Sequence, residues 1–322
     1  MVYFLQVRIR SDINQFKISP MKIKRREFLK RSAFGVSGML VAANMPRAAE
    51  AKVGKFDPYE TVPLGKSKLK LSRVCMGTGV RGGNRQSNQT RMGKEQFQTL
   101  IRGAYERGVR LFDMADLYGT HPYLIPALKD IPRDQYAIIS KIWWRPGGIP
   151  EKERPDADVV IPRFLKELGT DYIDLVLLHC VESPKWPEEL QKQMEILAKF
   201  KEKGTIRAHG VSCHTAEALE AAVDEPWVDS VHARINPYGM SMDKAAEKVP
   251  GILKRLHAAG KGVVGMKIMG EGKLRDDDEK RDESVRYVLG LGSVDILNVG
   301  FEKLDEIDDL ARRVNKVPRN QA

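Results

Sequence analysis

Short apolar runs alternate with amphipathic segments through residues 52–322. Brief apolar runs bounded by turn residues are typical of strands buried on both faces of a parallel sheet. The pattern predicts strands at 71–78, 111–115, 136–142, 173–179, 206–213, 230–236, 262–268 and 294–300. Helical spacing predicts helices at 94–107, 122–128, 156–168, 187–203, 216–223, 244–259, 279–289 and 302–314.

The strict alternation of strand and helix indicates the fold class. Eight strands and eight helices over about 260 residues are the number found in a (β/α)8 TIM barrel. An open, doubly wound sheet is the alternative. Because neither repeats nor a linker interrupts residues 52–322, we expect a single domain there. The longer irregular stretches, at 81–93, 143–154 and 270–278, follow predicted strands and would border the C-terminal face of the barrel.

Polar residues stand at the C-terminal edges of three consecutive predicted strands. Asp113 and Tyr118 lie in LFDMADLYG, Lys141 ends YAIISK, and His179 ends IDLVLLH. Strand C-termini converge on the active-site face of a parallel barrel. We therefore expect a carboxylate, a phenol, an ammonium and an imidazole around one cavity, which is a set suited to proton transfer.

These segments resemble those of the aldo-keto reductase family, and the resemblance covers residues 60–317. It rests on PLGKSKLKLSRVCMGTG, FDMADLYG, PRDQYAIISK, LGTDYIDLVLLH and GTIRAHGVS, which occur in the family's order. It implies hydride transfer between a nicotinamide cofactor and a carbonyl compound. Tyr118 would be the general acid, and Lys141 would lower its pKa. Asp113 would hold Lys141, and His179 would orient the carbonyl. Taken singly, each of the four residues also has an ordinary structural explanation.

The same resemblance implies a cofactor site, with NAD or NADP left open. The implied cofactor-binding residues are Gly77, Thr78, Ser212, Asn236, Lys267, Gly270, Lys273 and Lys303. The chain departs from the family pattern at His232, where Gln is usual, and at Ile235, where an aromatic residue is usual. Lys303 stands among acids, and acidic residues suit the ribose hydroxyls of NAD better than the 2′-phosphate of NADP.

Loop residues supply candidates for the substrate pocket. They are Arg81, Trp143, Trp144 and His214. GTGVRG (77–82) spells a dinucleotide-binding fingerprint, but loop residues and not a helix follow it, so we interpret it as a lining loop.

Two other functions stay open. A non-catalytic barrel that binds NAD(P) or a partner is one. A metal-dependent hydrolase is the other, suggested by His179, His209 and His214, although we expect no metal site because the usual HxH spacing is absent.

Charge and cysteine content narrow the partners. The first 51 residues carry ten Lys/Arg and three Asp/Glu, whereas the remainder carries 44 and 40. The basic excess is therefore concentrated at the N-terminus, and the body shows no basic stripe of the kind that binds nucleic acid. Cys75, Cys180 and Cys213 have no metal or disulfide spacing, so we expect buried free thiols. A small carbonyl or alcohol compound is the expected partner, and a monomer or weak oligomer is the expected state.

The N-terminus resembles a bacterial export signal. In residues 21–51 a basic segment is followed by a mildly apolar stretch and then by Ala49-Glu50-Ala51. Arg25-Arg26, with Phe28, resembles the twin-arginine (Tat) motif, which implies export of a folded protein to the periplasm by the Tat machinery. The stretch is too short and polar for a stable membrane span. We expect Met21 to be the true start, 1–51 to be the extension and signal, and 52–322 to be the barrel.

Overall fold

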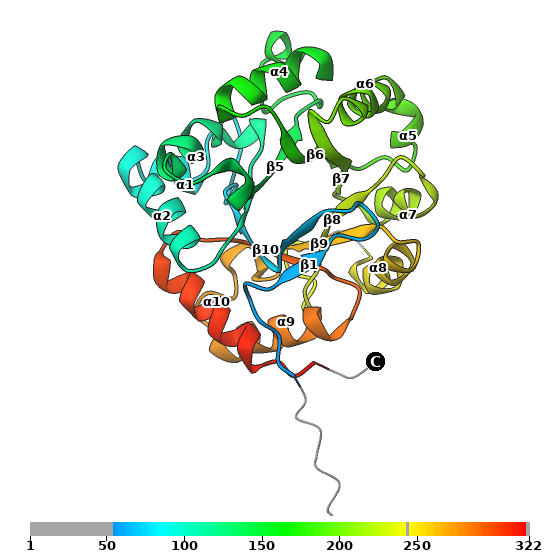
Figure 1. Ribbon diagram of the computed structural model, residues 1–322. Helices are drawn as coiled ribbons and strands as arrows, with labels where there is room; N and C mark the ends of the chain where they lie inside the picture. Colours follow the sequence, from blue (N-terminus) through cyan, green and yellow to red (C-terminus); the bar gives the residue numbers. More distant parts are fainter. Residues whose placement is uncertain (1–53, 243–244, 320–322) are drawn as a thin grey trace, which may run out of the picture. The chain divides into compact units, whose positions relative to one another are not determined.

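The computed structural model describes residues 54–242 and 245–319. The predicted export signal and start site therefore lie outside the described residues. Eight parallel strands close into a barrel (Figure 1) in the order β10-β3-β4-β5-β6-β7-β8-β9. They are β3 (Val74–Gly77), β4 (Leu111–Asp113), β5 (Ala137–Ile142), β6 (Ile173–Val181), β7 (Ile206–Cys213), β8 (Ser230–Arg234), β9 (Gly262–Met266) and β10 (Ile296–Gly300). The predicted TIM barrel is confirmed, and the open sheet is wrong.

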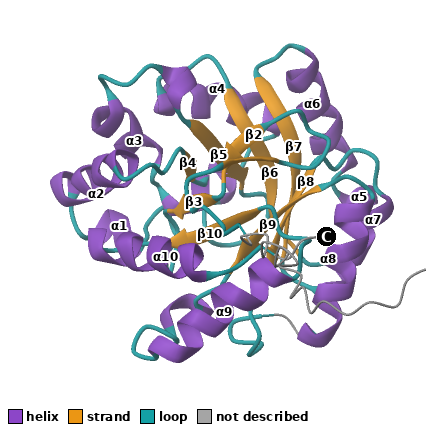
Figure 2. Ribbon diagram, turned by 60° about the horizontal axis from the view of Figure 1, so that its bottom comes forward, coloured by secondary structure: helices purple, strands orange, loops and turns teal. Residues whose placement is uncertain are grey.

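Helices surround the strands, as Figure 2 shows in a second view. The larger ones are α2 (Lys94–Glu106), α3 (His121–Leu128), α4 (Ala157–Leu168), α6 (Gln191–Glu202), α7 (Ala216–Asp224), α8 (Val249–Ala258), α9 (Asp278–Gly290) and α10 (Leu304–Lys316). Each buries one face. On α2, for example, Phe97, Ile101 and Ala104 are fully buried, and their spacing of three to four residues puts them on the side that faces the strands.

The interior of the barrel is closed at one end by a hairpin. Strand β1 (Thr61–Pro63) pairs antiparallel with β2 (Lys70–Ser72) and crosses the barrel end in Figure 1. Leu64 and Leu71 of this segment are buried in one cluster with Cys75 and other inward residues of the barrel strands. The predicted strand 71–78 is therefore wrong as one element, because its first residues belong to the hairpin and only Val74–Gly77 joins the barrel.

Two predicted helices have different bounds. The helix predicted at 187–203 is divided into α5 (Trp186–Glu189) and α6, because Leu190 has non-helical backbone angles where the chain turns to bury Trp186. The helix predicted at 244–259 begins, as α8, at Val249 after a short 3-10 turn at Ala246–Lys248, and Lys244 lies outside the described residues.

Shorter features complete the fold. A four-residue helix, α1 (Asn88–Arg91), interrupts the irregular stretch predicted at 81–93. All three cysteines are buried, as predicted. Within residues 54–242 and 245–319, no helix is both long enough and apolar enough to cross a bilayer.

Candidate active site

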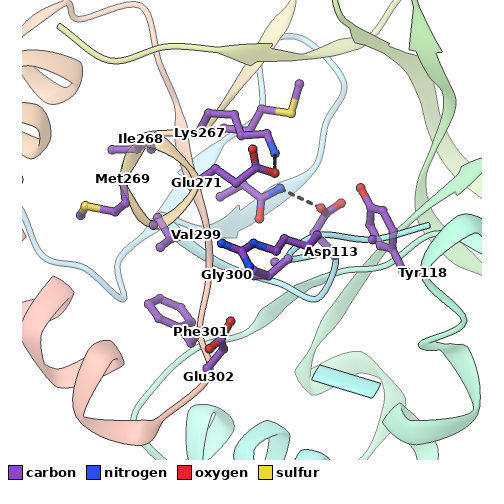
Figure 3. Close-up of a pocket in the computed structure, with 18 of the residues that line it drawn as sticks. Asp113, Tyr118, Lys267, Ile268, Met269, Glu271, Val299, Gly300, Phe301 and Glu302 are labelled. Atoms are coloured by element: carbon purple, nitrogen blue, oxygen red, sulfur yellow. Dashed lines mark hydrogen bonds and ion pairs between the residues drawn. The ribbon is translucent and has the colours of Figure 1, made fainter. Parts of the chain in front are cut away.

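A cavity of about 290 Å³ opens at the C-terminal ends of the strands. The four predicted catalytic residues, Asp113, Tyr118, Lys141 and His179, all line it. These residues come together because β4 pairs with β5 and β5 pairs with β6, so that the ends of the three strands lie side by side. Figure 3 shows Asp113 and Tyr118 together with further residues around the cavity, namely Lys267, Ile268, Met269, Glu271 and residues 299–302.

Lys141 and Asp113 form a buried ion pair at the base of the cavity. Lys141 Nζ donates to Asp113 Oδ1 at 2.5 Å and to the Met114 carbonyl at 2.9 Å. Both side chains are almost fully buried. Burial raises the pKa of Asp113, but Lys141 and the nearby His232 together outweigh burial and hold this pKa below its usual range. The carboxyl of Asp113 therefore stays ionised at neutral pH.

Tyr118 and His179 face each other above this pair. Tyr118 Oη lies 3.2 Å from His179 Nε2, and the two rings meet edge to face. Burial, with the Lys141 charge, lowers the pKa of His179 well below 6.5, so its imidazole is neutral. Burial, with the Asp113 charge, raises the pKa of Tyr118 well above 10, so its phenol keeps its proton.

The raised pKa of Tyr118 differs from the lowered pKa that the sequence predicted. Lys141 Nζ lies 4.9 Å from the centre of the Tyr118 ring, and its donated hydrogen bonds go to Asp113 and Met114. The ammonium thus faces the ring without a hydrogen bond to the phenol oxygen. The burial of the phenol and the negative charge of Asp113 therefore raise the pKa of Tyr118.

Local backbone geometry places Tyr118. It ends a 3-10 turn (Asp116–Tyr118), and Gly119 follows in the left-handed region at φ 64°. Asp116 anchors this turn, because its buried carboxylate accepts from Arg163 and from Arg85 Nε at 3.0 Å. The phenol is thereby carried on a turn that side chains from two other segments hold in place.

The GTGVRG segment packs directly on the Tyr118 ring. A Cβ added at Gly79 or at Gly82 would collide with carbon atoms of this ring. The fingerprint-like glycines therefore allow a close approach of the loop to Tyr118, and Arg81 of the same loop lines the cavity as predicted.

The two tryptophans support His179 from outside the lining of the cavity. Trp144 donates its indole N–H to the His179 carbonyl at 2.9 Å, and the Trp143 ring lies 5.3 Å from the His179 ring. The strand register shifts between Leu178 and Val181, and Cys180 adopts φ 58°. The predicted pocket tryptophans thus position the histidine, whereas the fourth predicted pocket residue, His214, lines the cavity.

The predicted cofactor residues fall into two groups. Gly77, Ser212 and Lys267 line the cavity, and Lys267 Nζ pairs with Glu271 at 2.6 Å (Figure 3). Outside the lining lie Thr78, Asn236, Gly270, Lys273 and Lys303.

Two of the residues outside the lining form hydrogen bonds to backbone carbonyls. The Thr78 hydroxyl donates to the Asp113 carbonyl at 2.8 Å. The Asn236 amide donates to the carbonyls of Met240 and Lys267. Both therefore shape the loops around the cavity from behind its surface.

Charged residues line the far end of the cavity. Arg275 lies 3.3 Å from Glu302 and 3.2 Å from Glu306, and Arg281 pairs with Asp309 at 3.0 Å. Lys303, predicted for this place, is instead the residue that precedes α10.

Asn298 was missed, and His232 was named only as a departure from the family pattern. Asn298 Nδ2 donates to Asp113 Oδ2 at 2.7 Å, and His232 Nε2 lies 3.5 Å from Asp113 Oδ1. The signal for Asn298 was a single amide inside the apolar run ILNVG, at a position of the strand that faces the interior.

His209, considered for a metal site, is remote from the cavity lining. Its ring stacks on Trp227 at 4.1 Å, and its Nδ1 lies 3.4 Å from Asp229. Across the part of the chain that the structure describes, no group of three or more His, Cys, Asp or Glu side chains is arranged to hold a metal ion.

Comparison with known proteins identifies the family. The model of the "Aldo/keto reductase family" matches residues 73–318, and the chain belongs to this family. It is similar to the NADH-specific methylglyoxal reductase of Escherichia coli (strain K12), at 26% identity over 202 residues, which are 56% of this chain and 60% of that protein. D-threo-aldose 1-dehydrogenase of Pseudomonas sp is 24% identical over 60% of this chain and 65% of its own length. The chain thus spans less than two thirds of either relative.

A solved structure shares the fold. The aldo-keto reductase AKR11C1 from Bacillus halodurans, in its holo form, superposes with a TM-score of 0.63 at 18% identity, covering 81% of this chain and 93% of that one.

The cavity fits a nicotinamide dinucleotide. It runs from Tyr118 to the start of α10, and two buried polar atoms facing it, Ser212 Oγ and Asn298 Oδ1, have no hydrogen-bond partner among the described residues. Orphaned polar groups of this kind are suited to a ligand that carries amide and hydroxyl groups. Glycine at position 77 keeps the approach to Asn298 open, because a Cβ there would lie 2.8 Å from Asn298 Oδ1.

Proposed function

We propose that the protein interconverts an aldehyde or ketone and the corresponding alcohol with NAD(P)(H). The observation that carries the proposal is the Tyr118–His179 pair, with Oη and Nε2 3.2 Å apart, above the buried Lys141–Asp113 pair in a cavity that fits a dinucleotide. A carbonyl oxygen placed between the phenol and the imidazole would accept hydrogen bonds from both.

In this function, a bound nicotinamide would supply or take the hydride at the carbonyl carbon. Tyr118 donates its phenolic proton to the carbonyl oxygen, and the high pKa of Tyr118 keeps that proton available at neutral pH. Neutral His179 donates through Nε2 to the same oxygen and fixes its position. The tyrosinate that forms lies against the Lys141 ammonium, whose charge offsets the new negative charge.

Asp113 and Asn298 keep the ammonium in place. Asp113 accepts from Lys141 through one oxygen and from Asn298 through the other. Both oxygens are thus occupied, so the carboxylate is held in one orientation. In the alcohol-oxidising direction the same groups act in reverse, with tyrosinate as the base.

The test is a stopped or continuous assay of NADH and NADPH oxidation with a panel of small aldehydes and ketones. Turnover by the wild type that disappears in Tyr118→Phe while the dinucleotide still binds supports the proposal. Binding of the dinucleotide without turnover of any carbonyl or alcohol would favour the non-catalytic barrel. Failure to bind either dinucleotide would remove the basis of the proposal.

We also propose that residues 1–51 direct export through the twin-arginine pathway and that the barrel functions in the periplasm. The support is the sequence alone: Arg25-Arg26, the mildly apolar stretch after it and the small residues at 49–51. Because the Tat pathway carries folded proteins, the dinucleotide would be loaded in the cytoplasm before export.

Fractionation of cells that produce the full chain tests this localisation. A shortened barrel should appear in the periplasm of wild-type cells, and the double change Arg25→Lys and Arg26→Lys should leave it in the cytoplasm. Equal periplasmic amounts of both proteins would contradict the twin-arginine route. N-terminal sequencing of the exported form would locate the cleavage site.

A further inference from the structure

His214 presents a second hydrogen-bond donor beside the proposed reaction site. It follows β7, and its backbone N–H donates to the Val181 carbonyl at 2.8 Å. Its ring lines the cavity and lies 6.4 Å from the His179 ring, at nearly a right angle. The mechanism above does not use it.

Contacts on the two ring nitrogens fix the position of the proton of His214. An arginine side chain only donates hydrogen bonds, and Arg234 Nη2 lies 2.6 Å from His214 Nδ1, so Nδ1 is the acceptor. Burial, with the Arg234 charge, lowers the pKa of His214, so the ring is neutral at neutral pH. The ring proton therefore resides on Nε2.

That Nε2–H points at a poor acceptor. Its neighbour is Cys180 Sγ at 3.3 Å, and burial raises the pKa of Cys180 to about 12, so the group is a neutral thiol. A thiol sulfur is a weak acceptor, whereas a carbonyl or hydroxyl oxygen is a strong one. Cys180 also lines the cavity, so an oxygen of a bound molecule that reaches this place would displace the thiol as the acceptor.

We propose that His214 donates through Nε2 to a second oxygen of the substrate, carried by the carbon next to the reacting carbonyl. The preferred substrates would then be α-hydroxy or α-oxo carbonyl compounds. The His179 and His214 rings both line the cavity 6.4 Å apart, so two oxygens on adjacent carbons of one substrate would each have a donor within reach. The His214 proton stays on Nε2 throughout, and the reaction itself is unchanged. This inference rests on the proposed carbonyl–alcohol function.

A matched pair of substrates tests the role of His214. The ratio of kcat/KM for 2-hydroxypropanal to that for propanal isolates the second oxygen, and we expect it to fall about 10-fold in His214→Phe. His214→Gln keeps an N–H donor and should restore part of the ratio. A ratio that is the same in the wild type and in His214→Phe, even if both rates fall, would overturn the inference.

A binding measurement separates the failure of this inference from failure of the proposed function. In protein labelled with ¹⁵N-histidine and saturated with the dinucleotide, 1,2-propanediol should shift the His214 Nε2–H signal and 1-propanol should not. This readout needs no turnover. Equal shifts with both alcohols, or with neither, would contradict the second contact, whereas absence of carbonyl turnover alongside a selective shift would contradict only the reaction.

The thiol supplies a second test. Cys180→Ser places a stronger acceptor next to Nε2–H, so the hydroxyl would compete with the substrate oxygen and the preference for 2-hydroxypropanal should decrease. Cys180→Ala removes the competitor and should leave that preference at least as strong. The opposite order of the two variants would be inconsistent with a donor shared between position 180 and the substrate.

Discussion

The two ends of the cavity are built from ion pairs of different kinds. At the ends of β4, β5 and β6, the side chains of Lys141 and Asp113 are 2% and 4% exposed. Beside β10 and α10, Arg275 and Glu302 are 53% and 24% exposed. Breaking a buried pair leaves a charge without a partner in a poorly solvated place, whereas exposed charges are compensated by water. We therefore expect the reaction end, which contains Lys141 and Asp113, to be rigid. We expect the α10 end, which contains Arg275 and Glu302, to adjust more readily to a ligand.

The largest effect expected at the reaction end is that of the phenol. Tyr118→Phe removes the proton donor, and we expect kcat to fall about 1000-fold, within the range for general acid catalysis. Tyr123→Phe is a matched control, because this tyrosine lies on α3 and contacts Phe97 outside the cavity lining. Steady-state kinetics with a small aldehyde, with dinucleotide binding checked by fluorescence, measures both. A Tyr118→Phe enzyme with a tenth or more of the wild-type kcat would disprove the role of the phenol.

The second prediction compares the two pairs directly. Lys141→Met leaves Asp113 buried without its main partner, and we expect the free energy of unfolding to fall by about 3–5 kcal/mol. Arg275→Met removes an exposed partner and should cost less than about 1 kcal/mol. Urea unfolding followed by circular dichroism gives both values. Equal losses would show that the difference in burial does not set the difference in stability between the two ends.

The reaction end was also the part that the sequence predicted best. Asp113, Lys141 and His179 lie at or near the ends of buried strands, where alternation and register leave little freedom, so the apolar runs sufficed to place them. The pKa direction of Tyr118 was not predictable, because it depends on whether Lys141 donates to the phenol or to Asp113. The spacing of residues in the sequence does not show which group accepts the hydrogen bond from Lys141.

The α10 end was predicted less well, because loops and not strands form it. The family resemblance implied Lys273 and Lys303, whereas Arg275, Glu302 and Glu306 line the cavity. The hairpin was likewise merged with the first barrel strand, since Leu71 continues the apolar run across Arg73 and only burial against the barrel interior separates the two elements. Sequence periodicity does not predict which side chains line a cavity when tertiary contacts between loops decide it.

The third prediction concerns the loss of stability at acidic pH. Burial lowers the pKa values of His179, His214 and His232, and that of His209 to about 4, all on β6, β7 and β8 or directly after them. Each stays neutral when folded and takes up a proton on unfolding, so the unfolded chain binds more protons below pH 6.5. The contribution of these histidines to the free energy of unfolding is therefore fully present above pH 6.5 and is lost as the pH falls.

Removing one such histidine should flatten this dependence. His209→Phe keeps a ring on Trp227 and should reduce the slope of unfolding free energy against pH by up to about 1.4 kcal/mol per unit between pH 6.5 and about pH 4. Urea titrations at several pH values in this window measure the slope. Parallel curves for the variant and the wild type would show that His209 does not change its protonation on unfolding.

The smallest effect is expected where the cavity meets α10. Glu302, Glu306 and Asp309 line this end, and a 2′-phosphate there would meet carboxylates, so we expect NADH to bind more tightly than NADPH. Glu302→Gln removes one negative charge, and its partners Asn88 and Arg275 remain to interact with the ligand. The ratio of the dissociation constants should shift toward NADPH by about 5-fold, as for a partly screened charge.

Lys303 provides the control for this shift, because it is the neighbouring charge and lies outside the cavity lining. Lys303→Ala should leave the ratio of the two dissociation constants within about 2-fold of the wild type, since Lys303 is exposed and lies outside the cavity lining. Fluorescence titration with each dinucleotide at low and at physiological salt measures the ratio. A loss of NADPH affinity in Lys303→Ala larger than the gain in Glu302→Gln would mean that Lys303, and not the acidic lining, selects the cofactor.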